Sequence, residues 1–346
     1  MSQVKPAPSI SGIVAIDVGG SGSRGAWVPL GSAKRMAGES VTVVGPRIRV
    51  TAAGVNHAAV VAEILDRLMT QLGEFDESCG AVCVGASGLL GLTAGAEDVH
   101  DVIRDRFPAA RSLVASDAVT AAVGALGGRA GAVVAAGTGA IAMGTDLGTI
   151  WKRVDGWGHV LGDAGGGAWL GAKALAVALE QFDGRRSDAG ALENAAVRRF
   201  GQLTELPRQI YTNDERAGLL ASFVPDVVAL SEAGHEPAVQ LCVAAGQELA
   251  KSTAAAMVEG VPHRASWTGG LLSQRSPITE HFGARLRQIV PDLELCEPVG
   301  SPLDGAVFLA AGLAEDAVAS PASLSIPPLA ETPFASFREG NVHVSR

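Results

Sequence analysis

The fold of this chain is decided by the stretch IVAIDVGGSGSR, Ile13 to Arg24. An apolar run typical of a buried strand ends at Asp17, and a turn rich in glycine and serine follows at once. Glycines allow positive φ angles and bring backbone N–H groups close to a polyphosphate, and a carboxylate at the strand end can hold a hydrated divalent cation. An ordinary glycine-rich β-turn is the alternative. The stretch predicts a phosphate-binding hairpin made by Asp17, Gly19, Gly20, Ser21, Gly22 and Ser23.

The composition is that of a large globular protein. Of the 346 residues, 47% are hydrophobic and 18% are charged, which is enough apolar content for the cores of two domains. The net charge is −9. This charge disfavours nucleic acid and anionic membranes as partners, because both are bound through clustered Lys and Arg. An anionic cofactor such as a polyphosphate would therefore need local hydrogen-bond donors and Mg²⁺.

The cysteines and the apolar segments indicate a cytoplasmic protein. No stretch combines the length and apolar content of a targeting sequence or a membrane span, and the most apolar run, 130–144, is interrupted by Gly137 and Gly139. The cysteines are too scattered for a disulfide framework and are expected to be small buried hydrophobes. They are Cys79, Cys83, Cys242 and Cys296.

Hydrophobic patterning divides the chain into two α/β halves. In the first half, three consecutive strands precede alternating helices and buried strands. The second half also begins with a strand, a glycine turn and a strand around 137–139, a weak internal repeat of the first hairpin. We expect an N-terminal lobe over 1–117, a C-terminal lobe over 118–301 with a helical insertion over 185–260, a last helix over 302–316 that returns to the N-terminal lobe, and a Pro/Ala/Ser-rich tail over 317–346 that is on the surface or partly disordered.

Five stretches occur in a specific order: DVGGSGSR from Asp17, ASDAVTAA around Asp117, AGTGA from Ala136, GWGHVLGDAGGG from Gly156 and WTGG from Trp267. Together they resemble the sugar kinase, heat-shock ATPase and actin superfamily, and within it the BadF/BadG-type family that includes N-acetylglucosamine kinase and bacterial glucosamine kinases. The resemblance covers roughly residues 13–314. It implies an α/β, two-lobed actin-like ATPase (ribonuclease H-like) fold with an α-rich insertion in the second lobe.

The same resemblance implies which residues bind the nucleotide. Two lobes would close on ATP and Mg²⁺, with Asp17 as the metal ligand. The first phosphate hairpin would be Asp17 to Ser23, the second phosphate turn Gly137, Thr138 and Gly139, and the adenosine-side turn Gly269 and Gly270.

Asp117 resembles the family's general base, which takes the proton of the sugar hydroxyl during phosphoryl transfer and also binds that hydroxyl. The alternative is that Asp117 caps the helix that follows it, and both roles are compatible. Asp163 resembles the family's sugar-binding aspartate, with capping of the helix at Gly166 as the alternative. Asn56 resembles an asparagine of the family whose amide binds a ring hydroxyl, with capping of the helix that follows it as the alternative. Gly139 is assigned to the sugar side as well as to the phosphate turn.

Three positions depart from the family pattern. Gly22 stands where a lysine or threonine is common, Ala140 where a serine is common, and Ala164 where a glutamate is common. The last two remove polar groups from the sugar side, so they affect the acceptor's identity more than ATP use. The expected activity is ATP-dependent phosphorylation of N-acetylglucosamine at the 6-hydroxyl, with glucosamine as the second acceptor, by a homodimer.

Three other functions are less consistent with the sequence. An activator ATPase of the 2-hydroxyacyl-CoA dehydratase type needs cysteines that hold an iron–sulfur cluster between subunits, whereas Cys79 and Cys83 lie on or beside an apolar strand. A zinc-stabilised sugar kinase of the repressor-related type would show a compact cysteine-rich cluster, which the sequence lacks. A non-catalytic sugar-binding regulator is disfavoured because Asp17, Asp117 and both glycine hairpins are retained.

Overall fold

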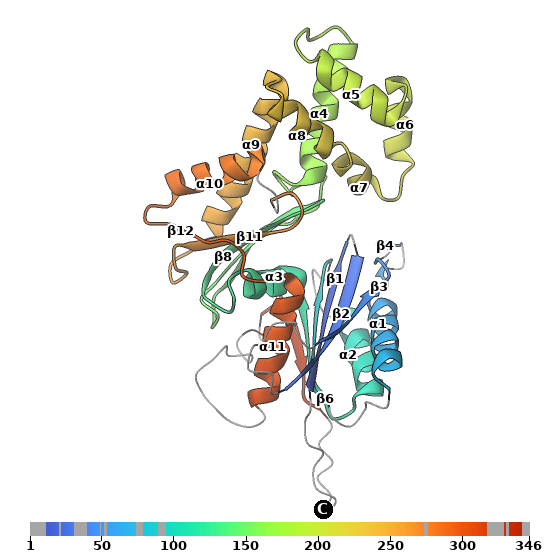
Figure 1. The fold of residues 1–346 in the computed structure, drawn as a ribbon, viewed down its shortest axis with the longest axis vertical. Helices are drawn as coiled ribbons and strands as arrows, with labels where there is room; N and C mark the ends of the chain where they lie inside the picture. The colour runs from blue at the N-terminus through green and yellow to red at the C-terminus, as the bar shows by residue number, and fades with distance from the viewer. Residues whose placement is uncertain are drawn as a thin grey trace, which may run out of the picture. The chain divides into compact units, whose positions relative to one another are not determined.

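The computed structural model divides into two compact units (Figure 1). Unit 1 lies within Met1–Arg129, Asp146–Trp151 and Pro298–Arg346, and unit 2 within Ala130–Thr145 and Lys152–Glu297. The structure describes residues 12–20, 22–30, 40–48, 50–51, 54–73, 79–88, 95–272, 276–316, 329 and 332–340.

Unit 1 is built on a six-stranded sheet in the order β13-β7-β6-β1-β2-β3. β1, β2 and β3 form an antiparallel meander, and β6 and β7 extend it in parallel from β1. This confirms the three opening strands and the buried parallel strands that the sequence predicts. The strands are β1 (Gly12–Gly19), β2 (Gly22–Pro29), β3 (Val41–Gly45), β6 (Cys79–Ala86), β7 (Arg111–Ser116) and β13 (Ala335–Arg338), and a separate small hairpin joins β4 (Val50–Thr51) and β5 (Gly54–Val55).

Helices cover both faces of this sheet, as Figure 1 shows. Alternate residues of β1, such as Val14 and Ile16, pack with α1 and α2, and α3 and α11 contact the sheet as well. Because both faces are covered, β1 and β6 are buried along nearly their whole length and read as continuous apolar runs. The helices are α1 (His57–Leu72), α2 (Gly95–Arg106), α3 (Asp117–Ala125) and α11 (Pro302–Asp316).

Glycines allow α3 and α11 to cross in close contact. A Cβ at Gly305 would overlap the carbonyl oxygen of Thr120, and one at Gly124 would overlap the carbonyl oxygen of Ser301. The contact therefore requires glycine on both helices. It also fixes α3, the helix whose first residue is Asp117.

We expect Gly305→Ala to lower the free energy of unfolding by about 1–3 kcal/mol, because the new methyl group must push two helix backbones apart. Gly312→Ala is the matched control on the same helix, because a Cβ there meets no described atom within 4 Å. That variant should be stabilised by up to about 1 kcal/mol through helix propensity. Thermal and urea unfolding of both variants measures the difference. Equal unfolding midpoints for wild type and Gly305→Ala would contradict the packing described here.

The boundary of the first unit differs from the sequence prediction. That prediction ends the N-terminal lobe at 117, whereas unit 1 continues through α3 to Arg129. The difference has a tertiary cause, because α3 packs against α11, which is distant in sequence. α11 itself contacts β1 and β6 within unit 1.

Part of the predicted tail, 317–346, forms a strand that its composition does not indicate. β13 pairs antiparallel with β7 at the edge of the sheet. The buried His100 ring joins the two strands, with Nδ1 2.8 Å from Ser112 Oγ on β7 and Nε2 3.1 Å from Ser336 Oγ on β13. Burial lowers the pKa of His100 to about 4, so the ring is neutral at pH 7.

Unit 2 contains a five-stranded sheet in the order β10-β9-β8-β11-β12. β8 and β9 are antiparallel, and β11 runs parallel to β8 and β12. Its strands are β8 (Gly131–Ala136), β9 (Ala140–Thr145), β10 (Trp151–Asp155), β11 (Arg264–Thr268) and β12 (Glu294–Leu295). Its helices are α4 (Gly167–Phe182), α5 (Gly190–Phe200), the 3₁₀ helix η2 (Leu203–Glu205), α6 (Leu206–Tyr211), α7 (Arg216–Ala221), α8 (Val224–Glu232), α9 (Glu236–Ala256) and α10 (Pro277–Ile289).

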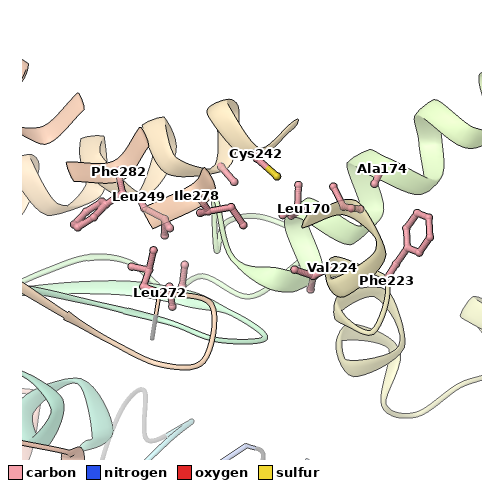
Figure 2. Close-up of a cluster of buried hydrophobic side chains, with 14 of the residues drawn as sticks. Leu170, Ala174, Phe223, Val224, Cys242, Leu249, Leu272, Ile278 and Phe282 are labelled. Carbon is pink, nitrogen blue, oxygen red and sulfur yellow. The ribbon is translucent and has the colours of Figure 1, made fainter. Parts of the chain in front are cut away.

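The core of unit 2 joins the sheet to these helices. Figure 2 shows Leu170 of α4, Leu249 of α9 and Phe282 of α10 in one buried cluster. The Phe282 ring also packs edge-on against Trp267 of β11, with a centroid distance of 6.3 Å. This core places the start of α4 beside the strand ends that carry the glycine turns.

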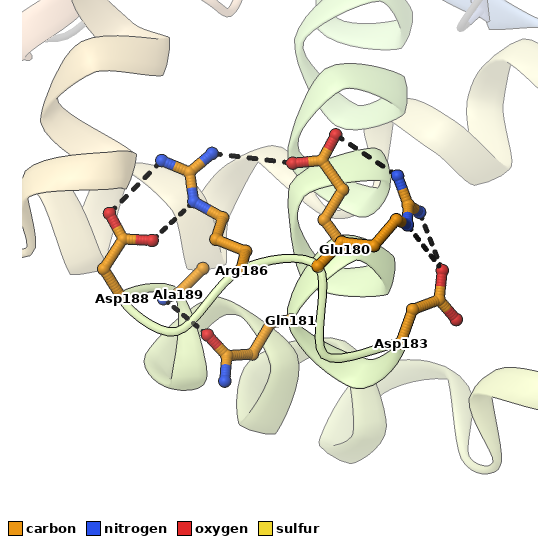
Figure 3. A network of polar contacts seen from close by, with 7 residues as sticks. Glu180, Gln181, Asp183, Arg186, Asp188 and Ala189 are labelled. Carbon is orange, nitrogen blue, oxygen red and sulfur yellow. Dashed lines mark hydrogen bonds and ion pairs between the residues drawn. The ribbon is translucent and has the colours of Figure 1, made fainter.

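The connection between α4 and α5 is closed by polar contacts (Figure 3). Arg186 pairs with Asp188 and Glu180, and the side chain of Gln181 accepts a hydrogen bond of 2.8 Å from the backbone N–H of Ala189. Exposed ion pairs of this kind contribute little to stability, so they mainly order the turn.

Among the described residues, no single helix has the length and apolar character of a membrane span, although Arg216–Glu232 and Glu236–Ala256 would satisfy these criteria as one pair bent by 117°.

Candidate functional site

The turn between β1 and β2 forms the predicted phosphate hairpin. Asp17 is paired in register with Arg24, and Gly19 with Gly22, so the chain reverses tightly at the strand ends. A Cβ at Gly20 or Gly22 would meet no described atom within 4 Å, which leaves the turn open to a ligand. Ser21 lies outside the described residues.

Ser23 is not available as a side-chain phosphate donor in this structure. It is only 2% exposed, and its hydroxyl donates a hydrogen bond of 2.5 Å to the carbonyl oxygen of Pro46. The hydroxyl therefore connects the hairpin to the residue that follows β3 through this hydrogen bond. A role for Ser23 in phosphate binding would have to come from its backbone.

Asp17 lies near the carboxyl end of β1, and Asp117 directly follows β7 in the same sheet, with β6 between the two strands. Burial raises the pKa of Asp17 to about 6; Arg24 opposes this shift, and the negative charge of Asp117 adds to it. Burial also raises the pKa of Asp117. Two desolvated carboxyl groups, one of which raises the pKa of the other, are typical of a site that receives a cation or a proton.

The start of α3 resolves which residue caps that helix. The N-cap is Ser116, whose hydroxyl accepts a hydrogen bond of 3.3 Å from Ala118 N. Ser116 Oγ also donates to Asp117 Oδ1 at 3.4 Å. The capping role that the sequence leaves open for Asp117 therefore belongs to Ser116.

Asn56 lies at the N-cap position of α1 and is exposed, but its side chain makes no capping hydrogen bond. The next residue, His57, is buried, and its Nε2 lies 2.7 Å from the carbonyl oxygen of Ser87. This contact joins the start of α1 to the residue that follows β6. The sugar-binding role of Asn56 stays a prediction.

The second phosphate turn lies in unit 2 between β8 and β9. Gly137 N donates to Gly139 O at 2.9 Å, which closes the turn. The first residues of α4 are bound to the same turn, because Gly167 N donates to Gly137 O and Ala168 N to Thr138 O, both at 2.8 Å. The helix start and the glycine turn thus form one structural element.

The turn at Gly269 and Gly270 adjoins this element. Gly269 follows β11 with a φ of 94°, a conformation that favours glycine. Leu271 N donates to Ala136 O, the last residue of β8, at 3.1 Å. The structure therefore brings together the two glycine turns that the sequence assigns to the nucleotide in unit 2.

Asp163 lies against the same glycine turn. A Cβ at Gly139 would lie 2.5 Å from Asp163 Oδ2, so only glycine fits there without displacing the carboxylate. Asp163 Oδ1 accepts a hydrogen bond of 3.0 Å from Gly158 N, and burial raises the pKa of Asp163. The N-cap of α4 is Gly166, so the capping alternative for Asp163 is wrong.

Asp155 is a site residue that the sequence reasoning missed. Its carboxylate accepts hydrogen bonds from the backbone N–H groups of Asp163 and Ala164, each at 2.8 Å. The available signal was an aspartate directly before the GWG step.

The burial of Cys79 and Cys83 bears on the activator-ATPase alternative. Cys79 and Cys83 lie within β6 and are 4% and 0% exposed. Burial raises the pKa of Cys79 to about 12 and raises that of Cys83 further, so neither thiol is prepared for metal binding. Within the described residues, no group of three or more His, Cys, Asp or Glu is placed to hold a metal ion.

Comparisons with known proteins find a family model, a curated relative and solved structures that are similar to this chain. A family model, described as the BadF/BadG/BcrA/BcrD ATPase family, matches residues 14–308. A curated relative, the N-acetylmuramic acid/N-acetylglucosamine kinase of Clostridium acetobutylicum, is 35% identical over 126 residues, which are 36% of this chain and 41% of the relative. The match therefore spans less than half of the relative's length.

Two solved structures show the fold. A Chromobacterium violaceum protein assigned as an N-acetylglucosamine kinase superposes with a TM-score of 0.67 at 23% identity, covering 88% of this chain and 100% of that one. A ROK family glucokinase from Streptomyces griseus, in complex with glucose and AMPPNP, gives 0.51 at 18% identity, covering 87% and 99%. The two-lobed α/β fold of sugar kinases and actin-like ATPases is thus confirmed, and helices α5 to α9 lie within the range 185–260 expected for its α-rich insertion.

Proposed function

We propose that this chain, which belongs to the BadF/BadG/BcrA/BcrD ATPase family, is an ATP-dependent kinase of an amino sugar. The observation that carries the proposal is the pair of desolvated carboxyl groups, Asp17 and Asp117, beside the open glycine hairpin of unit 1. Phosphoryl transfer needs a carboxylate that takes the proton and backbone donors that hold the phosphates, and in this proposal Asp117 and the hairpin would supply them.

Asp117 acts as the general base in this proposal. As the sugar oxygen bonds to the γ-phosphorus and the bond to the bridging oxygen of ADP breaks, the hydroxyl proton moves to the Asp117 carboxylate. Burial raises the pKa of this group, which makes it a stronger base than an exposed aspartate. Ser116 caps α3, and its hydroxyl also donates a hydrogen bond to Asp117 Oδ1.

The nucleotide phosphates are assigned to the backbone of the hairpin at Gly19 to Gly22 and to the turn at Gly137 to Gly139, and the adenosine side to Gly269 and Gly270. Mg²⁺ fits Asp17, because a nearby cation would offset the desolvation of this carboxylate. The lack of a larger ligand cluster among the described residues is compatible with Mg²⁺, which usually binds one or two carboxylates, phosphate oxygens and water. When bound, the cation would neutralise charge on the phosphates.

The proposed acceptor is N-acetylglucosamine, phosphorylated at its 6-hydroxyl, with glucosamine as the second choice. The curated relative is a kinase of N-acetylated amino sugars, which supports this order. Asp163 and Asn56 would bind ring hydroxyls, since carboxylate and amide oxygens accept such hydrogen bonds. Ala140 and Ala164 offer no polar side chain, so backbone groups such as those of Gly139 would have to take part in acceptor recognition.

The acceptor order is tested by measuring kcat/KM for N-acetylglucosamine, glucosamine and glucose side by side. We expect the acetylated sugar to be preferred, because a site that bonds an acetamide leaves polar groups unpaired with sugars that lack it. A clear preference for glucosamine would reverse the order. A clear preference for glucose would remove the amino-sugar assignment.

A further inference from the structure

The loop that carries Asp163 is held by Asp155. Asp155 ends β10, and its two carboxylate oxygens accept hydrogen bonds from two successive backbone N–H groups: Oδ1 from Asp163 N and Oδ2 from Ala164 N, each at 2.8 Å. A bidentate arrangement of this kind fixes both the position and the orientation of the peptide that joins Asp163 to Ala164.

The loop has an unfavourable backbone that requires such support. Asp155 and Asp163 have φ angles of 61° and 55°, in the left-handed region that non-glycine residues rarely adopt. A conformation like this persists only where the surrounding contacts determine it, and it is concentrated at functional sites. A Cβ at Gly162 would overlap Asp155 Oδ1, so the approach of the carboxylate also depends on glycine there.

The Asp163 side chain is held on two further sides. Its Oδ1 accepts a hydrogen bond from Gly158 N, and its Oδ2 faces the Cα of Gly139. The negative charge of Asp155 also raises the pKa of Asp163. The Asp155 carboxylate therefore acts on Asp163 in two ways: it binds the Asp163 backbone, and its negative charge acts on the Asp163 side chain.

We propose that Asp155 is a positioning residue for the acceptor: it sets the backbone of Asp163 so that the Asp163 carboxylate meets the sugar hydroxyls. This inference rests on the proposed function. Asp155 itself touches backbone rather than sugar, so its effect should appear in acceptor binding and should disappear when Asp163 is already altered.

The test uses Asp155→Asn, which keeps one acceptor oxygen but replaces the other with an NH₂ group that faces an N–H donor. Losing one charge-assisted hydrogen bond should raise KM for the acceptor about tenfold or more, whereas KM for ATP should change by less than about twofold. Asp146→Asn is the matched control, because Asp146 also accepts backbone hydrogen bonds, from Gly148 N and Ile150 N at 2.8 Å, in the turn before β10. That variant should leave both KM values unchanged.

Two further measurements separate positioning from a general loss of structure. In the Asp163→Asn background, adding Asp155→Asn should change acceptor kcat/KM by less than about twofold, because neighbours that act through one group are non-additive. Hydrogen exchange at the amides of Asp163 and Ala164 should be faster in Asp155→Asn than in wild type, and this readout does not depend on activity.

If the wild type is active, two results overturn this inference but not the proposed function. In the first, Asp155→Asn keeps the wild-type KM for the acceptor. In the second, its KM values for the acceptor and for ATP rise equally. Unchanged amide exchange at Asp163 and Ala164 overturns it too. A wild type without any sugar-dependent release of ADP overturns the proposed function, and the inference with it.

Discussion

Replacing Asp117 with asparagine is expected to lower kcat for sugar phosphorylation by about 10²-fold or more, the usual scale of general-base catalysis. Asparagine has nearly the same size but cannot take the hydroxyl proton. Because Ser116 caps α3, the helix keeps its N-terminal hydrogen bond in the variant. The measurement is ADP release at saturating ATP and acceptor, with circular dichroism and thermal unfolding to establish that the variant is folded.

Asp98→Asn is the control for this change. Asp98 is an exposed acidic residue in the first turn of α2, so its replacement removes a similar helix-terminal charge without touching the candidate site. This control should keep wild-type kcat. A well-folded Asp117→Asn variant with near wild-type kcat would show that Asp117 is not the base.

Removal of divalent cations is expected to abolish nearly all turnover. Asp17 is 8% exposed and its pKa is raised to about 6, so the site presents a poorly solvated acidic group near a second one where phosphates would bind. Adding phosphates without a cation would place further negative charge there. Assays in excess chelator, followed by addition of Mg²⁺, measure the effect. Full turnover in the presence of the chelator would contradict the assignment of Asp17.

The parts of the fold that local sequence determines were predicted well. The strand before Asp17 and the glycine turn after it are recognisable because their apolar run and their glycines are contiguous. The same holds for the turn at 137–139, which follows a buried strand as expected. The residues that signal each of these features lie within one hairpin, so they can be recognised without knowledge of distant contacts.

Features that depend on distant contacts were missed or misplaced. β13 is a strand because Ser336 and its neighbours meet β7 and His100, more than 200 residues earlier. α3 joins unit 1 because Gly124 and Gly305 let two distant helices approach. Neither contact leaves a periodic pattern in the sequence.

In the candidate site, too, the features set by local sequence were predicted and those set by tertiary structure were not. Asp163 was found from its motif, but the hydrogen bonds that Asp155 accepts depend on a left-handed backbone that no residue preference indicates. Likewise, the sequence places Ser23 in the phosphate hairpin, whereas the fold directs its hydroxyl to the carbonyl oxygen of Pro46. Side-chain direction in such turns is set by tertiary structure.

The most direct test of the central claim is to incubate the purified protein with ATP, Mg²⁺ and N-acetylglucosamine and to identify the products by mass spectrometry. The account predicts an N-acetylglucosamine monophosphate formed in equal amount to ADP, and no comparable ADP without sugar. ADP release that is independent of sugar, with no phosphosugar from N-acetylglucosamine, glucosamine or glucose, would contradict it.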